Sequence, residues 1–280
     1  MSTSTASSTE PSVAENTAIE GLSHQSNHSG FQAKHRQIIR TYELERVIPF
    51  FPPGATVLEV GAGAGWQARL LAERGFTVQA IDIPSSNYNA LREWDVMPYD
   101  GVTIPCRDNS VDVVFSSNVL EHVPHIEAFQ RELQRVLRPG GVSIHVMPTA
   151  TWRTATTLSF FLKRALQVTG FAKKGSNSSG SHGGSSSARR SVAQKIRGAI
   201  FAPLHGVRGN LITETYFFSS TFWTSLFRRT GWTVQKVLPN GLFYSGNRVC
   251  GAALSIEARE NLAKLFGSSC KIYILTKKKS

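Results

Sequence analysis

Short apolar runs alternate with segments of helical periodicity along most of the chain. Runs rich in β-branched residues predict strands, and segments with apolar residues three or four positions apart predict helices. Strands are expected at residues 56–60, 76–82, 96–99, 111–116, 142–147, 232–238 and 270–276. Helices are expected at residues 31–48, 66–74, 85–93, 125–137, 152–171, 191–200, 219–230 and 255–266. This alternation predicts an α/β protein with a doubly wound, mostly parallel sheet of seven strands.

Two polar stretches interrupt this pattern. Residues 1–30 contain too few apolar side chains to form a packed core, so a disordered tail is expected there. Residues 150–212 form a basic insertion of low complexity, which includes a glycine and serine run at 175–187. The insertion follows the fifth strand, at the carboxyl edge of the sheet, where open α/β folds bind ligands. We therefore expect one domain over residues 31–280, with the insertion acting as a lid.

The 280-residue chain has a net charge of +12, and this charge is unevenly distributed. Residues 1–132 contain 9 basic and 16 acidic side chains, which gives a net charge of −7. Residues 133–280 contain 22 basic and 3 acidic side chains, which gives +19. Between Leu133 and Thr213 there are twelve basic residues and no acidic one. The asymmetry indicates an anionic partner (phosphate, nucleic acid or a membrane surface) or else a solvated basic insertion.

The composition excludes several classes of protein. A hydrophobic fraction of 41% excludes wholesale disorder, and no apolar run approaches the roughly 20 residues that span a bilayer. The first twenty residues carry three glutamates and no arginine, unlike a secretory signal or a transit peptide. Cys106, Cys250 and Cys270 lie far apart, so neither a disulfide framework nor a metal site is predicted. A reducing, cytoplasmic compartment is expected.

A glycine-rich turn joins the first predicted strand to the next helix, with the sequence Glu-Val-Gly-Ala-Gly-Ala-Gly at residues 59–65. Gly61 permits a tight turn, Gly63 lets a ligand approach the backbone, and amides at the helix start favour an anionic group. Asp82 closes the next strand, where a carboxylate can accept both hydroxyls of a ribose. Trp66 stands where a dinucleotide site has a small residue, and no P-loop Gly-Lys-Ser/Thr follows. The turn therefore predicts a nucleoside ligand and disfavours NAD and FAD.

Residues 57–65, with the sequence Val-Leu-Glu-Val-Gly-Ala-Gly-Ala-Gly, resemble the first motif of the class I S-adenosylmethionine-dependent methyltransferases. Segments that resemble later motifs of this family follow in order at residues 78–83, 100–123 and 133–141. The similarity is to the broad branch that contains the quinone-biosynthesis (type 11) methyltransferases. It is close over residues 50–150 and loose over residues 215–280. The resemblance implies a Rossmann-like methyltransferase fold and S-adenosyl-L-methionine as the cofactor.

The resemblance also implies roles for single residues. Glu59 would orient the turn and the amino end of the cofactor, and Asp82 would hold the ribose hydroxyls. Asp100 would accept a hydrogen bond from the adenine amine, unless it is only a turn residue beside Gly101. The implied cofactor contacts are Glu59, Gly61, Ala62, Gly63, Gly65, Asp82, Ile83, Asp100, Gly101, Ser116, Ser117 and Asn118. The last three would face the methyl donor.

Methyl transfer from a sulfonium is an in-line displacement, in which the protein orients the reactants and excludes water. His122 is a candidate general base because imidazole titrates near neutrality, although this segment could simply begin a helix. His145 lies inside a predicted strand, and a hydrogen-bonded core position is expected for it. His205, Glu214 and Tyr216 follow the insertion and would frame an acceptor pocket; an ordinary loop is the alternative.

Three functions remain open from the sequence. The first is methyl transfer to a small or lipid-linked acceptor, with the basic insertion resting on an anionic membrane surface. The second is RNA methylation, in which the basic second half holds phosphates. The fourth strand is not followed by the Asn/Asp-Pro-Pro-Tyr sequence used on base amines, and this disfavours methylation of nucleic-acid amines. The third is a module that binds the cofactor without catalysis.

Overall fold

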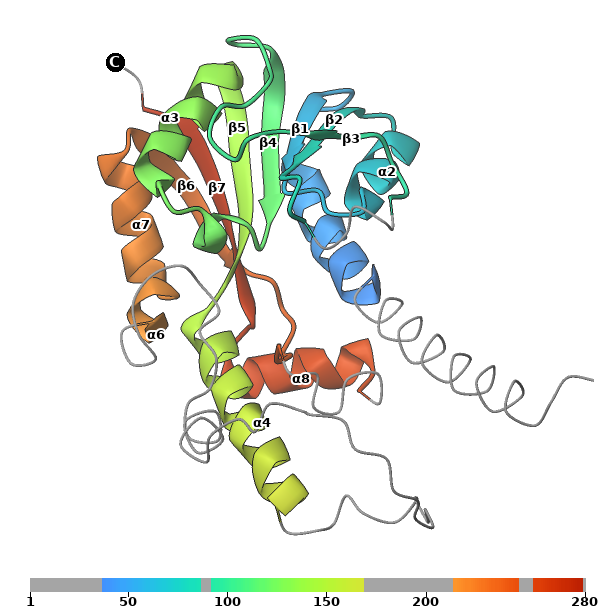
Figure 1. The fold of residues 1–280 in the computed structure, drawn as a ribbon, viewed down its shortest axis with the longest axis vertical. Coiled ribbons are helices and arrows are strands. Elements are labelled where there is room, and N and C mark those ends of the chain that lie inside the picture. Colours follow the sequence, from blue (N-terminus) through green and yellow to red (C-terminus); the bar gives the residue numbers. More distant parts are fainter. Residues whose placement is uncertain (1–36, 87–91, 169–213, 247–253, 279–280) are drawn as a thin grey trace, which may run out of the picture.

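One seven-stranded sheet organises the residues that the structure, a computed structural model, describes: 37–86, 92–168, 214–246 and 254–278. Its strand order is β3-β2-β1-β4-β5-β7-β6 (Figure 1). The strands are β1 Thr56–Val60, β2 Thr77–Asp82, β3 Val96–Pro98, β4 Val111–Ser117, β5 Leu137–Pro148, β6 Trp232–Pro239 and β7 Cys270–Lys277. Strands β1 to β5 pair in parallel, whereas β7 pairs antiparallel with β5 and β6. The predicted α/β class and mostly parallel sheet are confirmed.

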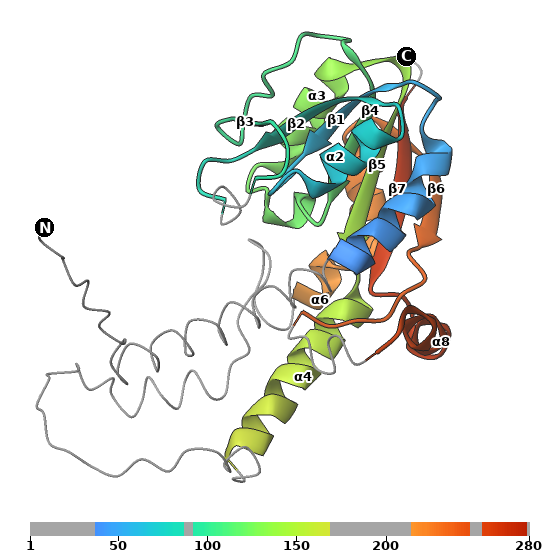
Figure 2. The same cartoon turned by 90° about the vertical axis from the view of Figure 1, so that its right-hand side faces the viewer.

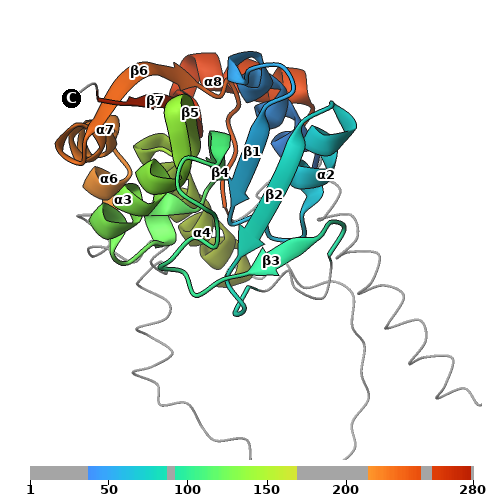
Figure 3. The ribbon, with the colours of Figure 1, turned by 90° about the horizontal axis from the view of Figure 1, so that it is seen from above.

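Helices cover both faces of the sheet (Figure 3). The helices of the described residues are 37–47, α2 Trp66–Glu73, α3 Ile126–Val136, α4 Ala150–Val168, α6 Glu214–Phe217, α7 Ser220–Arg229 and α8 Ile256–Phe266. Two 3₁₀ turns, η1 Ile48–Phe50 and η3 Leu120–His122, accompany them. On one face α3 and α7 pack through buried residues such as Leu133 and Phe227. On the other face helix 37–47 and α2 pack through Leu44 and Leu71. The central strands are therefore apolar on both sides, as in other parallel sheets covered by helices.

The strand order reverses between β1 and β4. From β1 the chain runs outward through β2 to β3, and it then returns to the other side of β1 as β4. Val60 at the end of β1 lies beside Ser116 of β4 in the parallel register. Open α/β sheets form a crevice at such a reversal, outside the carboxyl ends of the strands. This topology identifies the ends of β1 and β4 as the place for a ligand.

Strand β5 begins earlier than predicted. It starts at Leu137, which pairs with Val111, and the register then shifts before Val113. Pro139, Gly140 and Gly141 therefore lie within an irregular first part of the strand, rather than in a loop after the helix. A side chain at Gly141 would come within 2.8 Å of the Asp112 carbonyl oxygen, so the close approach of the two strands requires glycine.

Other expectations lie partly outside the described residues. The helix predicted at 85–93 is replaced at its start by a turn, in which the Ser86 amide donates to the Ile83 carbonyl, and residues 87–91 are not described. The tail at 1–30, the glycine and serine run at 175–187 and the helix predicted at 191–200 all lie outside the described residues. None of the helices in the described ranges combines the length and the hydropathy needed to cross a bilayer.

The first part of the predicted insertion is α4, which leaves the carboxyl end of β5 and projects below the sheet (Figures 1 and 2). A buried ion pair joins it to α6: Arg153 Nε lies 2.6 Å from Glu214 Oε2, and their side chains are 2% and 0% exposed. Just before α4, the Thr149 hydroxyl donates to the carbonyl oxygens of Ser268 and Ser269. These contacts fix the first part of α4 to α6 and to the segment that precedes β7.

Breaking the buried pair tests this arrangement. Glu214→Gln is expected to lower the free energy of unfolding by about 3–5 kcal/mol, because it removes one charge from a buried ion pair. Urea unfolding measures the loss. Glu127→Gln is the matched control, since it breaks the exposed pair with Arg229 and should cost only about 0–1 kcal/mol. Equal losses in the two variants would contradict the anchoring role of the buried pair.

Candidate functional site

The glycine-rich turn lies at the carboxyl end of β1, where the strand order reverses. Gly61 has φ +69°, and a side chain there would come within 2.4 Å of Val119, which follows β4. Gly65 has φ +81°, and a side chain there would come within 2.5 Å of the Trp94 Cβ. Glycine is required at both positions because neither the backbone conformation nor the space admits a side chain.

The Asp82 carboxylate holds the turn. Asp82 ends β2 and is 8% exposed; its Oδ2 accepts from the Gly63 amide at 2.9 Å, and its Oδ1 accepts from the Ile83 amide at 2.8 Å. The amides of Gly61 and Ala62 donate to the Ile81 carbonyl oxygen. Each carboxylate oxygen accepts more than one hydrogen bond, so these contacts leave acceptor positions for the hydroxyls of a ribose.

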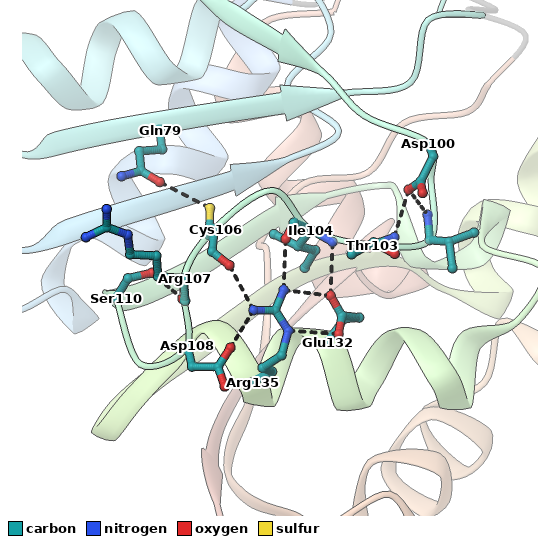
Figure 4. A network of polar contacts seen from close by, with 11 residues as sticks. Gln79, Asp100, Thr103, Ile104, Cys106, Arg107, Asp108, Ser110, Glu132 and Arg135 are labelled. Atoms are coloured by element: carbon teal, nitrogen blue, oxygen red, sulfur yellow. Dashed lines mark hydrogen bonds and ion pairs between the residues drawn. The ribbon is translucent and has the colours of Figure 1, made fainter.

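Three predicted cofactor contacts, Ile83, Asp100 and Gly101, lie near one another after β2 and β3. A side chain at Gly101 would come within 3.3 Å of the Ile83 side chain, which is 39% exposed. Asp100 Oδ1 accepts from the amides of Val102 and Thr103 at 2.8 and 2.7 Å (Figure 4). These backbone hydrogen bonds hold the pKa of Asp100 below its usual value. Asp100 thus closes a turn beside Gly101, as the structural alternative predicted, and it does so next to the proposed nucleoside position.

Arg135 of α3 fixes the loop that follows Asp100. Its Nη2 donates to the Ile104 carbonyl at 2.8 Å, and its Nη1 donates to the Cys106 carbonyl at 2.8 Å and to Asp108 Oδ1 at 2.7 Å (Figure 4). Glu132, one turn earlier, pairs with Arg135 and accepts from the Ile104 amide. Sequence reasoning missed this role, because several partners of Arg135 are carbonyl groups of a loop about 30 residues away, which leave no side-chain signal.

Glu59 is a buried carboxyl group at the end of β1. It is 2% exposed, and its Oε2 has no hydrogen-bond partner among the described residues. Burial raises the pKa of Glu59 to about 8; the charge of Asp82 adds to the shift, and the Ala68 amide opposes it. An unpartnered buried carboxyl oxygen beside a glycine turn fits a ligand with a cationic end, because a cation would satisfy the oxygen and favour its ionised form.

The residues at the end of β4 face opposite sides of the sheet. Ser116 was expected to face the methyl donor, but its buried hydroxyl lies 2.8 Å from His145 Nδ1, on the α7 side. Successive side chains of a strand alternate between faces, so Ser117 points the other way, toward Arg40. His145 is fully buried between Ser116 and Ser143, which confirms the core position predicted for it, and burial lowers its pKa to about 3.

His122 and Glu121 follow β4 in η3. The His122 side chain is 46% exposed, and the partial burial of its ring lowers its pKa. Its Nε2 lies 3.8 Å from Glu121 Oε1. Glu121 is 4% exposed, and neither of its carboxylate oxygens has a hydrogen-bond partner among the described residues. Burial raises the pKa of Glu121 to about 7, against the lowering effect of Arg40.

The three acceptor-pocket candidates are separated by the structure. Glu214 is fully buried, and its ion pair with Arg153 occupies the carboxylate, so this side chain is an internal anchor rather than a pocket wall. Tyr216 is 55% exposed and packs edge-to-face against Phe217 and Phe222. His205 lies outside the described residues. Among the described residues, no cluster of three or more His, Cys, Asp or Glu could hold a metal ion.

The raised pKa of Glu59 predicts a pH dependence of stability. The unfolded chain releases this proton near pH 4.5, whereas the folded chain retains it to about pH 8. Between these values the folded state binds more protons, so its free energy of unfolding falls as the pH rises. Glu59→Gln cannot ionise, and urea unfolding across this window should give a shallower slope than wild type. Glu257→Gln, at an exposed position of α8, should keep the wild-type slope; an unchanged slope in Glu59→Gln would contradict the assignment.

Comparison with known proteins agrees with this geometry. Residues 58–145 match the family described as "Methyltransferase domain". The ubiquinone biosynthesis O-methyltransferase of Paramagnetospirillum magneticum is 35% identical over 131 residues, which are 44% of this chain and 51% of that protein. The 2-methyl-6-phytyl-1,4-hydroquinone methyltransferase of Synechocystis is 37% identical over 103 residues, 33% of this chain and 32% of that protein. A solved SAM-dependent methyltransferase from Archaeoglobus fulgidus aligns over 89% of this chain and 99% of its own, at 16% identity and a TM-score of 0.51.

The chain spans between about a third and a half of the length of these curated relatives. The matched region contains the glycine turn, Asp82, Asp100 and the end of β4, which are the features that carried the resemblance in the sequence. At 16% identity the solved structure speaks for the fold alone, and its fold is the one observed here. Residues 58–145 therefore carry a methyltransferase domain, within a fold that is shared with S-adenosylmethionine-dependent methyltransferases.

Proposed function

We propose that the protein transfers a methyl group from S-adenosyl-L-methionine to a small or lipid-linked acceptor. The observation that carries the proposal is the turn held by Asp82 beside the unpartnered Glu59 carboxyl. The Asp82 carboxylate would accept hydrogen bonds from the ribose hydroxyls of the cofactor, and the Glu59 carboxylate would pair with its cationic amino end. No other pair of buried carboxyl groups among the described residues stands beside a glycine turn at a point where the strand order reverses.

The residues of the site would have separate tasks. When bound, the cofactor would supply a methyl carbon that a nucleophile attacks in line, while the bond to sulfur breaks and the neutral thioether leaves. Asp82 accepts from the ribose hydroxyls while it holds the turn, and Ile83 and Gly101 enclose the base. Glu59 pairs with the cationic amino end. Ser117 and Asn118 shape the side that faces the acceptor, and the half-exposed His122 takes the acceptor proton where the nucleophile carries one.

The relatives and the surface of α4 support a lipid-linked acceptor at a membrane. The two relatives named above act, by their names, in ubiquinone biosynthesis and on a phytyl hydroquinone. Leu158, Phe161 and Leu162 are 69%, 38% and 51% exposed and share one face of α4. The stretch around them contains no acidic residue from Leu133 to Thr213, which suits a surface of anionic lipid. The protein would then work in the cytoplasm, at the membrane surface.

The same charge asymmetry supports RNA as a second candidate substrate. The second half of the chain has a net charge of +19, and phosphate contacts of basic side chains provide most of the affinity of nonspecific RNA binding. This alternative predicts binding that weakens steeply with salt. It also predicts that RNA, rather than the lipid fraction, becomes labelled when the protein and labelled cofactor are added to a cell extract.

Cofactor binding gives the first test. S-adenosyl-L-methionine at about 100 times its Kd should raise the free energy of unfolding by about 2.7 kcal/mol, seen as a higher Tm. Asp82→Asn should lose most of this increase, because the variant loses the ribose acceptor and weakens the turn. Asp112→Asn is the matched control. Asp112 also accepts a hydrogen bond from a backbone amide, that of Thr56, yet it lies near the start of β4, at the opposite end of the strand from the site. An equal Tm increase in both variants would refute the assigned ribose site.

Transfer of label gives the second test. Incubation of the protein with methyl-labelled cofactor and separated extract fractions should label the organic-solvent fraction. Labelled RNA would instead establish the second candidate. Cofactor binding without label in any fraction would favour a module without catalysis, and this outcome would refute methyl transfer while it leaves the binding site intact.

The exposed face of α4 gives the third test. Replacing Leu158 and Leu162 together by Glu should reduce sedimentation of the protein with phosphatidylglycerol vesicles several-fold, because it removes apolar area and adds negative charge. Leu265→Glu is the control, since Leu265 is 74% exposed but lies on α8. If the double variant and Leu265→Glu sediment with the vesicles to the same extent, α4 is excluded as the membrane contact.

A further inference from the structure

Helix 37–47 precedes the matched residues 58–145 and lies along one face of the sheet (Figure 2). A polar side chain of this helix reaches the end of β4, because Arg40 donates to Ser117. Arg40 pairs with Glu43 on the same helix and donates to Ser117 and Asn118 at the end of β4. The proposed function places those two β4 residues on the acceptor side of the cofactor. The helix and the reacting side of the site are therefore in direct contact.

The guanidinium of Arg40 contacts three other side chains. Its Nη1 lies 2.6 Å from Glu43 Oε2 and donates to Ser117 Oγ at 3.2 Å. The Asn118 amide, oriented with its oxygen toward the guanidinium, accepts from the same nitrogen at 2.8 Å. The Arg40 side chain is 22% exposed. A planar, delocalised guanidinium can satisfy several acceptors at fixed angles, whereas an ammonium on a flexible chain does not fix their relative positions.

Glu43 fixes the direction in which Arg40 points. Its side chain is fully buried, and its Oε1 accepts from Asn240 Nδ2 and from the Tyr244 hydroxyl, both at 2.6 Å. The same hydroxyl lies 3.0 Å from the Cys270 sulfur, at the start of β7. Despite the lowering effect of burial, the Glu43 carboxylate raises the pKa of Arg40 above its usual value, so Arg40 remains charged at every relevant pH. The guanidinium is thus held from the β6–β7 side of the sheet.

The conformation at Asn118 depends on this support. Asn118 has φ +55°, a left-handed conformation that few non-glycine residues adopt. The next residue, Val119, occupies the space in front of Gly61, where a side chain would come within 2.4 Å of it. A shift at Asn118 would therefore move Val119 against the glycine turn, and it would move Glu121 and His122, which follow in η3.

We propose that Arg40 is a positioning residue for methyl transfer: it holds Ser117 and Asn118 so that η3 and the glycine turn keep the relative position that the reaction requires. The proposal rests on the proposed function, because it assigns a use to the same site. It adds helix 37–47 to the functional unit. Arg40 acts through the β4 residues and does not itself contact the reacting atoms.

The test compares Arg40→Gln with Arg40→Lys and with Arg46→Gln. Arg46 is on the same helix but exposed, with its Nη1 3.5 Å from the Tyr42 hydroxyl, so it provides the matched control. In Arg40→Gln, label transfer into extract at saturating cofactor should fall at least tenfold, while the calorimetric Kd for S-adenosylhomocysteine should change less than threefold. Arg40→Lys keeps the charge and should recover part of the rate and most of the Tm. Arg46→Gln should behave as wild type.

Amide hydrogen exchange reports on the loop independently of catalysis. The Asn118 amide donates to the Val146 carbonyl at 2.8 Å, and the His122 amide donates to the Val119 carbonyl at 2.9 Å. Both should exchange at least tenfold faster in Arg40→Gln than in wild type, with no change in Arg46→Gln. Unchanged exchange at these amides, or equal loss of rate in Arg40→Gln and Arg46→Gln, would overturn the proposal. A wild-type chain that does not bind the cofactor would instead refute the proposed function, and exchange would still decide whether Arg40 holds the loop.

Discussion

The hydrogen bonds from the Gly63 and Ile83 amides to the Asp82 carboxylate connect the parts of the site to each other. One oxygen holds the turn after β1, and the other holds the chain as it leaves β2. A carboxylate can do this because it accepts several hydrogen bonds and carries no donor that would oppose the amides. The position of this glycine turn also determines the space that Val119, which follows β4, occupies beside Gly61. The Asp82 side chain and the lack of a side chain at Gly61 therefore bring the ends of β1, β2 and β4 into one site.

Buried charge is used in two different ways around this site. Arg153 with Glu214, and Arg40 with Glu43, are paired. The first pair joins α4 to α6, whereas the second lies within helix 37–47 and orients Arg40 toward Ser117 of β4. Glu59 and Glu121 are buried with unpartnered oxygens, and burial raises the pKa of each toward or above neutrality. A buried unpaired carboxyl group destabilises a fold unless it is protonated or meets a cation. Glu59 and Glu121 are therefore side chains that selection for folding stability alone would not favour at these buried positions.

The sequence predicted the sheet better than it predicted the contacts of the site. Glycines at residues 61 and 65 and an acid at 82 were identified because turn geometry and strand ends leave local signals. The prediction failed at Ser116, which faces His145 on the α7 side, because an apolar strand buried on both faces gives no pattern to tell one face from the other. It also failed at Glu214, since a polar residue next to an insertion gives no sign that Arg153, 61 positions away, will bury it.

The alternation of strands and helices, the turn after β1 and the acid at the end of β2 could all be identified from the amino-acid sequence. Each depends on residues within a few positions of one another, through side-chain periodicity and backbone conformation. Two arrangements became visible only in the folded chain: β7 inserts antiparallel between β5 and β6, and helix 37–47 reaches the end of β4. They depend on which surfaces bury one another and on which polar side chains meet across 60 or more residues. A single sequence records the groups that can pair, and the fold selects the pairs that form.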